Sequence, residues 1–231
     1  MSGSERPKGG YQGLYRMKPA AQGMVDPLVA WAIRHGVRPN VISAAAILVS
    51  ACGALAIAAS PTVPALLFLV PFAAAARLVL NLMDGLVARR TGLTSATGEM
   101  WNELGDRVCD VLLIGSLALV PAVGPALAFG AVIASLLASY AGITARAAGG
   151  RRQYGGVMSK PGRMIVLSVA APLSVLLAEP RILWAGTLII LIGALLTLAQ
   201  RLRAAARDGS EREERPEGGD RLDGEGPVDA G

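Results

Sequence analysis

Aromatic, cysteine and histidine residues are scarce in this chain of 231 residues. Aromatics make up 4% of it and do not interleave with basic residues along one face, so the sequence does not favour nucleic-acid binding. The two cysteines, Cys52 and Cys109, have the spacing of neither a zinc site nor a disulfide framework, and we expect them to be packing residues. His35 is the single histidine, which leaves little material for a zinc site or a histidine-based catalytic triad.

Charge is also sparse, because charged residues make up 17% of the chain against 53% hydrophobic residues. Soluble domains seldom have this composition. Each of six apolar stretches approaches the length of about 20 residues that a helix needs to cross a bilayer. Because nothing resembles the alternating strands of a barrel, we predict an all-α polytopic membrane protein with six transmembrane helices. The six stretches are 41–60, 64–86, 104–123, 125–146, 163–179 and 182–200.

Basic residues gather before the first apolar stretch, around the second and fourth connections and after the last stretch, whereas the opposite connections hold only Arg181. The positive-inside rule therefore predicts that both termini and the 87–103 loop are cytoplasmic. With a net charge of +5, basic residues at membrane edges are expected to contact anionic lipid headgroups. They are Arg6, Lys8, Arg16, Lys18, Arg34, Arg38, Arg89, Arg90, Arg146, Arg151, Arg152, Lys160, Arg163, Arg201, Arg203 and Arg207.

The sequence predicts one membrane domain over residues 11–207, between two polar ends. Residues 1–10 are rich in glycine, serine and charge, and we expect them to be flexible. Residues 11–38 mix apolar and basic side chains, as is typical of an amphipathic helix in the cytoplasmic interface. Residues 208–231 lack apolar periodicity and are predicted to be disordered.

Polar side chains recur at helical spacing on two otherwise apolar segments. Asn81 and Asp84 share one helix face, which Arg77 joins one turn earlier. Asn102, Asp106 and Asp110 form an i, i+4, i+8 stripe on the next segment, with Glu99 and Glu103 on an adjoining stripe. Ionisable groups inside a membrane are costly, so these residues are the candidates for function.

Converging carboxylates repel one another unless a cation lies among them. Oxygen ligands favour Mg²⁺, Mn²⁺ or Ca²⁺, and Mg²⁺ commonly binds substrate phosphates together with one or two carboxylates, so a phosphate-bearing substrate is indicated. The small residues Gly85, Ala88 and Gly98 would let such a ligand approach the backbone closely, and Arg89 can neutralise phosphate oxygens. For the glycines alone, close helix packing is an equally good explanation.

The same segments resemble the signature of the CDP-alcohol phosphatidyltransferases, Asp-x2-Asp-Gly-x2-Ala-Arg-x8-Gly-x3-Asp-x3-Asp. Every spacing is kept, although Asn81 and Asn102 stand where the family has its first and third aspartates. Residues 38–43 are similar to the family's Pro-Asn-x-Ile-Thr segment, and the resemblance covers about residues 25–200. The matching positions are Asp84, Gly85, Ala88, Arg89, Gly98 and Asp106.

The resemblance implies metal-dependent transfer of a phosphatidyl or similar phosphoalcohol group from a CDP-linked lipid donor to an acceptor hydroxyl, with release of CMP. It implies two ions, Mg²⁺ or Mn²⁺, and a homodimer. Asp106 would be the catalytic base, and Gly85, Ala88, Arg89 and Gly98 would line the CDP site. Carried over by position, the metal ligands would be Asn81, Asp84, Asn102 and Asp106.

The two asparagines remove two negative charges from the implied metal site. We hypothesise that Glu103 and Asp110 restore them as additional metal ligands, since both lie on or beside the acidic stripe. The alternatives are that Asp110 pairs with Arg107 three residues away, and that Glu103 only favours the start of its helix.

Five basic residues flank the next cytoplasmic connection. As a hypothesis, some of them bind the phosphate of a sugar-phosphate or small-alcohol acceptor. The alternative for each is ordinary topology-setting charge. They are Arg146, Arg151, Arg152, Lys160 and Arg163.

Three functions remain after these steps. The favoured one is an enzyme of phospholipid biosynthesis with its active site open to the cytoplasm. The second is a non-catalytic membrane protein that kept the fold after losing two carboxylates. A small transporter is the third, but it often shows half-to-half symmetry, and none is visible in the sequence. The signature concerns the donor and does not identify the acceptor alcohol.

Overall fold

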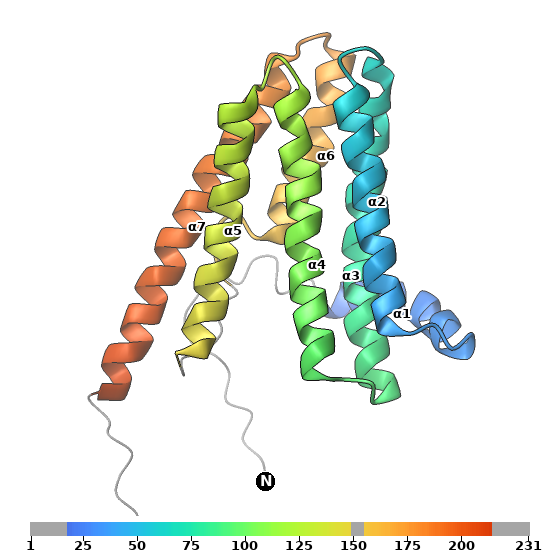
Figure 1. Ribbon diagram of the computed structural model, residues 1–231, viewed down its shortest axis with the longest axis vertical. Helices are drawn as coiled ribbons and strands as arrows, with labels where there is room; N and C mark the ends of the chain where they lie inside the picture. Colours follow the sequence, from blue (N-terminus) through green and yellow to red (C-terminus); the bar gives the residue numbers. More distant parts are fainter. Residues whose placement is uncertain (1–17, 149–154, 214–231) are drawn as a thin grey trace, which may run out of the picture.

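The computed structural model describes residues 18–148 and 155–213, and these residues form helices and connections without a β-strand. The long helices α2 to α7 run side by side, with connections alternating between the two ends of the bundle (Figure 1). The prediction of an all-helical fold is confirmed. The elements are α1 (Lys18–Arg34), α2 (Pro39–Ala59), the 3-10 helix η2 (Pro64–Leu69), α3 (Val70–Thr91), α4 (Ala96–Gly115), the 3-10 helix η3 (Ser116–Leu119), α5 (Pro125–Ala147), α6 (Lys160–Leu176) and α7 (Arg181–Glu213).

Proline, glycine and serine set where many of these helices begin and end. Five elements have a proline in their first two positions, where the missing N–H would have no helical partner. Gly92 ends α3 in the left-handed conformation at φ +69°, which glycine adopts without strain. Ser95 then begins α4, because its Oγ accepts a 3.0 Å hydrogen bond from the N–H of Gly98.

Four of the helical segments are long and apolar enough to cross a membrane: α2, η2 with α3, α5, and the first 28 residues of α7. Their outward positions carry large apolar side chains, including Leu48, Leu55 and Phe72. α4 and α6 do not meet these limits, because α4 carries a series of charged residues and α6 has 17 residues. The structure thus gives four candidate spans where the sequence predicted six.

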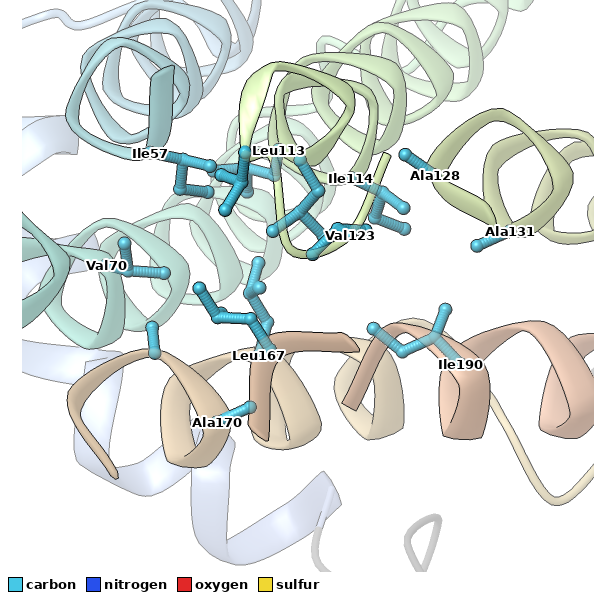
Figure 2. Close-up of a cluster of buried hydrophobic side chains, with 14 of the residues drawn as sticks. Ile57, Val70, Leu113, Ile114, Val123, Ala128, Ala131, Leu167, Ala170 and Ile190 are labelled. Carbon is cyan, nitrogen blue, oxygen red and sulfur yellow. The ribbon is translucent and has the colours of Figure 1, made fainter. Parts of the chain in front are cut away.

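The centre of the bundle is an apolar cluster to which α2 through α7 all contribute (Figure 2). Ile57 of α2, Leu113 of α4 and Leu167 of α6 are fully or almost fully buried in it. α2 packs against both α3 and α4, and a Cβ at Gly53 would lie 2.8 Å from side-chain atoms of Ala73 and Leu113. Only glycine therefore fits at this crossing, where α2 packs closely against both α3 and α4.

α1 lies within the stretch predicted as an interfacial helix and packs against the end of α3. Val25 and Val29 are buried in a second apolar cluster with Val87 of α3. An exposed ion pair of 2.6 Å between Asp26 and Arg90 joins the same two helices. An adjoining face of α1 exposes large apolar side chains, namely Met24, Leu28 and Trp31.

The C-terminal helix is longer than the sequence indicated. α7 continues to Glu213, past residue 208, where we predicted a disordered tail to begin. Glutamate and arginine are good helix formers, so a helix can continue beyond the end of the apolar periodicity. The predicted flexible segment 1–10 and the rest of the predicted tail lie outside the described residues.

Candidate active site

The two polar segments meet in a small pocket between α2, α3 and α4. Its volume is about 10 Å³, which is room for about one water molecule or one metal ion. The predicted meeting of Asn81 and Asp84 with Asn102 and Asp106 is therefore present in the fold. The lining residues are Ser43, Ala46, Asn81, Asp84, Asn102, Gly105, Asp106 and Cys109.

Asp84 is buried at the pocket wall and held by two hydrogen bonds. Ser43 Oγ donates a bond of 2.8 Å to Asp84 Oδ2, and the N–H of Gly85 donates to Asp84 Oδ1. Both bonds fix the carboxylate and still leave lone pairs on its oxygens for a further ligand. The role of Ser43 was missed from sequence, although it closes the 38–43 segment one turn into α2.

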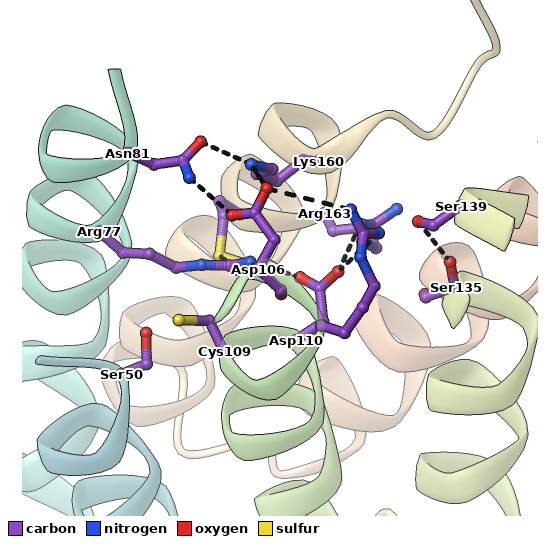
Figure 3. A network of polar contacts seen from close by, with 12 residues as sticks. Ser50, Arg77, Asn81, Asp106, Cys109, Asp110, Ser135, Ser139, Lys160 and Arg163 are labelled. Carbon is purple, nitrogen blue, oxygen red and sulfur yellow. Dashed lines mark hydrogen bonds and ion pairs between the residues drawn. The ribbon is translucent and has the colours of Figure 1, made fainter. Parts of the chain in front are cut away.

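Asp106 lies at the centre of a network that joins α3, α4 and α6 (Figure 3). Asn81 Nδ2 donates bonds of 2.7 Å to Asp106 Oδ1 and 3.0 Å to Asn102 Oδ1. Lys160 Nζ donates to Asp106 Oδ2 and, at 2.6 Å, to Asn81 Oδ1. Lys160, predicted from sequence as an acceptor ligand, thus lies against the proposed catalytic carboxylate.

Asp110 lies one turn further along α4 and does not line the pocket. Its Oδ1 accepts a bond of 2.8 Å from Arg77, and its Oδ2 accepts a bond of 2.7 Å from Arg163 (Figure 3). Asp110 and Arg77 are wholly buried, and Arg163 is 3% exposed. Arg107 also lies 4.0 Å from Asp110, as the i, i+3 spacing predicted. Asp110 is thus an ion-pair partner that joins three helices, and Arg163 is enclosed, so the geometry does not favour Asp110 as a metal ligand or Arg163 as a ligand of an acceptor phosphate.

Glu103 is the other residue that we expected to restore the lost charge. Its Oε1 accepts a 2.6 Å bond from Arg107 Nη2, one turn along α4, and Glu103 is not among the residues that line the pocket. Across residues 18–148 and 155–213, no cluster of three or more Asp, Glu, His or Cys side chains could hold a metal. The hypothesis of a compensating pair of acids is therefore not supported, and we leave Glu103 out of the proposed metal site.

The residues expected to bind the donor lie along α3 and at the start of α4. A Cβ at Gly85 would approach Arg89 Nη1 to 3.3 Å, so the small residue lets this guanidinium lie back over α3. Gly98 belongs to the cap of α4, and Ala88 is half-buried on α3. Of the other basic candidates, Arg146 is exposed at the end of α5. Arg151 and Arg152 lie outside the described residues.

The donor set in the pocket fits a hard divalent cation. Asp84 of α3 offers carboxylate oxygens, and α4 adds those of Asp106 and the amide carbonyl oxygen of Asn102, around a space of single-ion size. Oxygen ligands of this kind suit Mg²⁺ or Mn²⁺ better than metals that prefer sulfur. Cys109 does not change this, because its Sγ is directed to the backbone oxygen of Ala46 at 3.6 Å.

Comparison with known proteins shows which family the chain belongs to. A family model for CDP-alcohol phosphatidyltransferase matches residues 36–199, and the chain belongs to that family. Over 156 residues the chain is 28% identical to the inner membrane protein YnbA of Escherichia coli (strain K12), which covers 68% of this chain and 77% of that protein. It is 30% identical over 192 residues to an uncharacterized protein of Aquifex aeolicus (strain VF5), covering 81% and 91%.

Solved structures show the same fold. The crystal structure of Mycobacterium tuberculosis phosphatidylinositol phosphate synthase (PgsA1) in complex with manganese and citrate has a TM-score of 0.65 at 22% identity, covering 78% of this chain and 88% of that one. The same enzyme with CDP-DAG bound gives 0.61 at 22% identity, covering 78% and 92%. With its four apolar helices, the chain is an integral membrane transferase of the CDP-alcohol phosphatidyltransferase class, acting in phospholipid biosynthesis.

Proposed function

We propose that the pocket catalyses metal-dependent transfer of a phosphatidyl or related phosphoalcohol group from a CDP-alcohol, such as CDP-diacylglycerol, to an acceptor hydroxyl, with release of CMP. The observation that carries the proposal is that Asp84 and Asp106, from two signature segments, line one small pocket together with Asn81 and Asn102. The fold and family support the same reaction.

Mg²⁺ or Mn²⁺ would be held by Asp84, Asp106 and the carbonyl oxygen of Asn102. When bound, such an ion neutralises the charge of a diphosphate and polarises its phosphoryl group. Ser43 and the N–H of Gly85 orient the Asp84 carboxylate before any ligand arrives. This fixed geometry reduces the rearrangement that binding requires.

Asp106 is proposed as the base that takes the proton from the acceptor hydroxyl. Asn81 and Lys160 each donate a hydrogen bond to one of its oxygens, which fixes the orientation of the carboxylate. An acceptor within reach of Asp106 also lies near the ammonium of Lys160. Lys160 and the exposed Arg146 are the described residues that we propose for the acceptor phosphate, and the acceptor itself is not identified.

The donor diphosphate is proposed to bind over Gly85 and Ala88, with Arg89 neutralising its oxygens. Gly98 has no side chain and so leaves space for the donor at the start of α4. Gly85→Ala is expected to raise the KM for the CDP-linked donor about tenfold, because the new Cβ would lie 3.3 Å from Arg89 Nη1 and would displace the guanidinium from the proposed contact with the diphosphate. The free energy of unfolding should hold or rise, since alanine is the better helix former. Steady-state kinetics measure the donor KM, and thermal unfolding checks the stability.

Gly23→Ala is the matched control, because a Cβ at that position on α1 meets nothing within 4 Å. It should leave the donor KM unchanged. An unaltered KM in Gly85→Ala would contradict the proposed donor site.

The topology is proposed to be six crossings, with α4 packed between α2 and α5 and α6 packed between α3 and α7. Arg77 of α3 and Arg163 of α6 bind the buried Asp110 of α4, and Arg77 also donates to the backbone oxygen of Asp106, so the protein shields these charges from lipid. Basic residues at one end of the bundle support a cytoplasmic site and cytoplasmic termini. The exposed apolar face of α1 supports its position in the cytoplasmic interface. A homodimer is also proposed, and light scattering of the detergent-solubilised protein tests it.

The test is to incubate purified protein with labelled CDP-diacylglycerol, a panel of alcohols and sugar phosphates, and Mg²⁺ or Mn²⁺. We expect CMP release that depends on one acceptor and stops when EDTA removes the metal. Absence of release with every acceptor would favour a second candidate, a non-catalytic membrane protein that retains the fold. Asn81, Asn102 and the Lys160–Asp106 ion pair are what favour that candidate, since each weakens a metal site of carboxylates.

A further inference from the structure

Nitrogen donors fill part of the space between the metal-site residues. Lys160 can only donate hydrogen bonds, so its 2.6 Å contact must be to the side-chain oxygen of Asn81. That orientation turns the Asn81 amide group toward Asn102 Oδ1 and Asp106 Oδ1. The NH₂ group of Asn81 and the ammonium of Lys160 thus lie next to Asp106, where the family signature would place converging carboxylates.

An aspartate at position 81 could not make this network. Its oxygens would face those of Asp106 without a proton between them, and the repulsion would require a cation. Four aspartates carry four negative charges, whereas Asp84 and Asp106 carry two. The ammonium of Lys160 already offsets one of these at Asp106, so little charge is left to hold two divalent ions.

The remaining space is on the Asp84 side. Asp84 keeps free lone pairs beside its bonds to Ser43 and Gly85, and the pocket that it lines with Asp106 has room for one ion. Mg²⁺ typically binds through one or two carboxylates together with substrate phosphates.

We propose that this site holds a single divalent cation, next to Asp84 and Asp106, and that the ammonium of Lys160 takes the place of the second ion that the family resemblance implies. The inference rests on the proposed function in assuming that this pocket binds metal. It identifies Lys160 as a positioning residue that supplies fixed charge, and it explains how two asparagines can be tolerated.

The first test counts Mn²⁺ per chain by electron paramagnetic resonance on protein in lipid nanodiscs. The unaltered protein should bind one Mn²⁺, and Asn81→Asp with Asn102→Asp should bind two. Asn40→Asp is the control, because it makes the same change at an exposed position outside the pocket, and it should bind one. If the double variant does not fold, Asn102→Asp alone is used and should also gain an ion.

Two Mn²⁺ ions in the unaltered protein would overturn the inference, as would a double variant that still binds one. CMP release is measured on the same samples. Release with two bound ions would overturn the single-ion inference and leave the proposed function intact. One bound ion without CMP release with any acceptor would leave the single-ion inference intact and contradict the proposed function.

The second test isolates the charge of Lys160. Lys160→Met keeps most of the side-chain length and removes the ammonium, so Mn²⁺ should bind about tenfold more tightly, because a like charge next to the ion is gone. Arg203→Met, on an exposed part of α7, should leave Mn²⁺ affinity unchanged. Unchanged or weaker Mn²⁺ binding in Lys160→Met would contradict the proposal, since a merely structural lysine predicts no gain.

Discussion

Asp106→Asn is expected to lower the rate of CMP release from CDP-diacylglycerol about a hundredfold or more. Asparagine keeps one carbonyl oxygen, which can still accept the bond from Lys160, whereas its NH₂ group cannot accept the bond from Asn81. One of the two contacts is lost, and the helices around the pocket should still pack. Asparagine cannot take a proton from the acceptor, and loss of a general base typically costs about a hundredfold to ten-thousandfold in rate. The measurement is initial rates at saturating donor and acceptor, with thermal unfolding as a check on folding.

Glu99→Gln is the matched control for this variant. It makes the same acid-to-amide change on α4, at an exposed residue that does not line the pocket. Its rate should stay within about twofold of the unaltered protein. A full rate in Asp106→Asn would show that the base lies elsewhere.

Asp110→Ala is expected to lower the free energy of unfolding in detergent by about 3–5 kcal/mol. The change leaves the guanidinium groups of Arg77 and Arg163 buried without their shared carboxylate, and an uncompensated buried charge is costly. Because this ion pair joins α3, α4 and α6, the loss should appear as a cooperative shift of the whole unfolding transition. Reversible unfolding in mixed micelles measures it.

Asp26→Ala is the control, since it removes an ion pair whose side chains are 46% and 43% exposed, and such pairs contribute about 0–1 kcal/mol. Asp110→Asn, which keeps one acceptor oxygen and the side-chain volume, covers the case in which Asp110→Ala does not fold. Both Asp110 variants should bind Mn²⁺ as the unaltered protein does, where they fold. Normal stability with weakened Mn²⁺ binding would restore Asp110 as a metal ligand.

The positions of the helices and the two halves of the site could be predicted from sequence because each depends on local pattern. Apolar length predicts where long helices lie, and helical spacing places Asn81 with Asp84, and Asn102 with Asp106, on single faces. A short connection then brings the two faces together. The number of membrane-spanning helices was harder to predict. α4 is apolar only on some faces, and its charged residues depend on neighbouring helices for shielding from lipid.

The partners of each charged residue could not be predicted, because they come from helices distant in the sequence. Spacing along α4 predicted that Asp110 pairs with Arg107, and the two do lie 4.0 Å apart. Its shorter contacts, however, come from Arg77 of α3 and Arg163 of α6. Lys160 was noted as a basic residue at a membrane edge, and only the packing of α6 against α3 brings it to Asp106. Periodicity defines the faces of one helix and does not specify which other helix packs against each face.

Anomalous X-ray diffraction at the manganese edge, from crystals grown with MnCl₂ and CDP-diacylglycerol, examines the pocket most directly. We predict one anomalous peak between Asp84 and Asp106, in contact with the diphosphate of the nucleotide. Manganese or nucleotide bound away from these two carboxylates, or a lipid donor bound with no metal near α3 and α4, would contradict the assignment of this pocket as the active site.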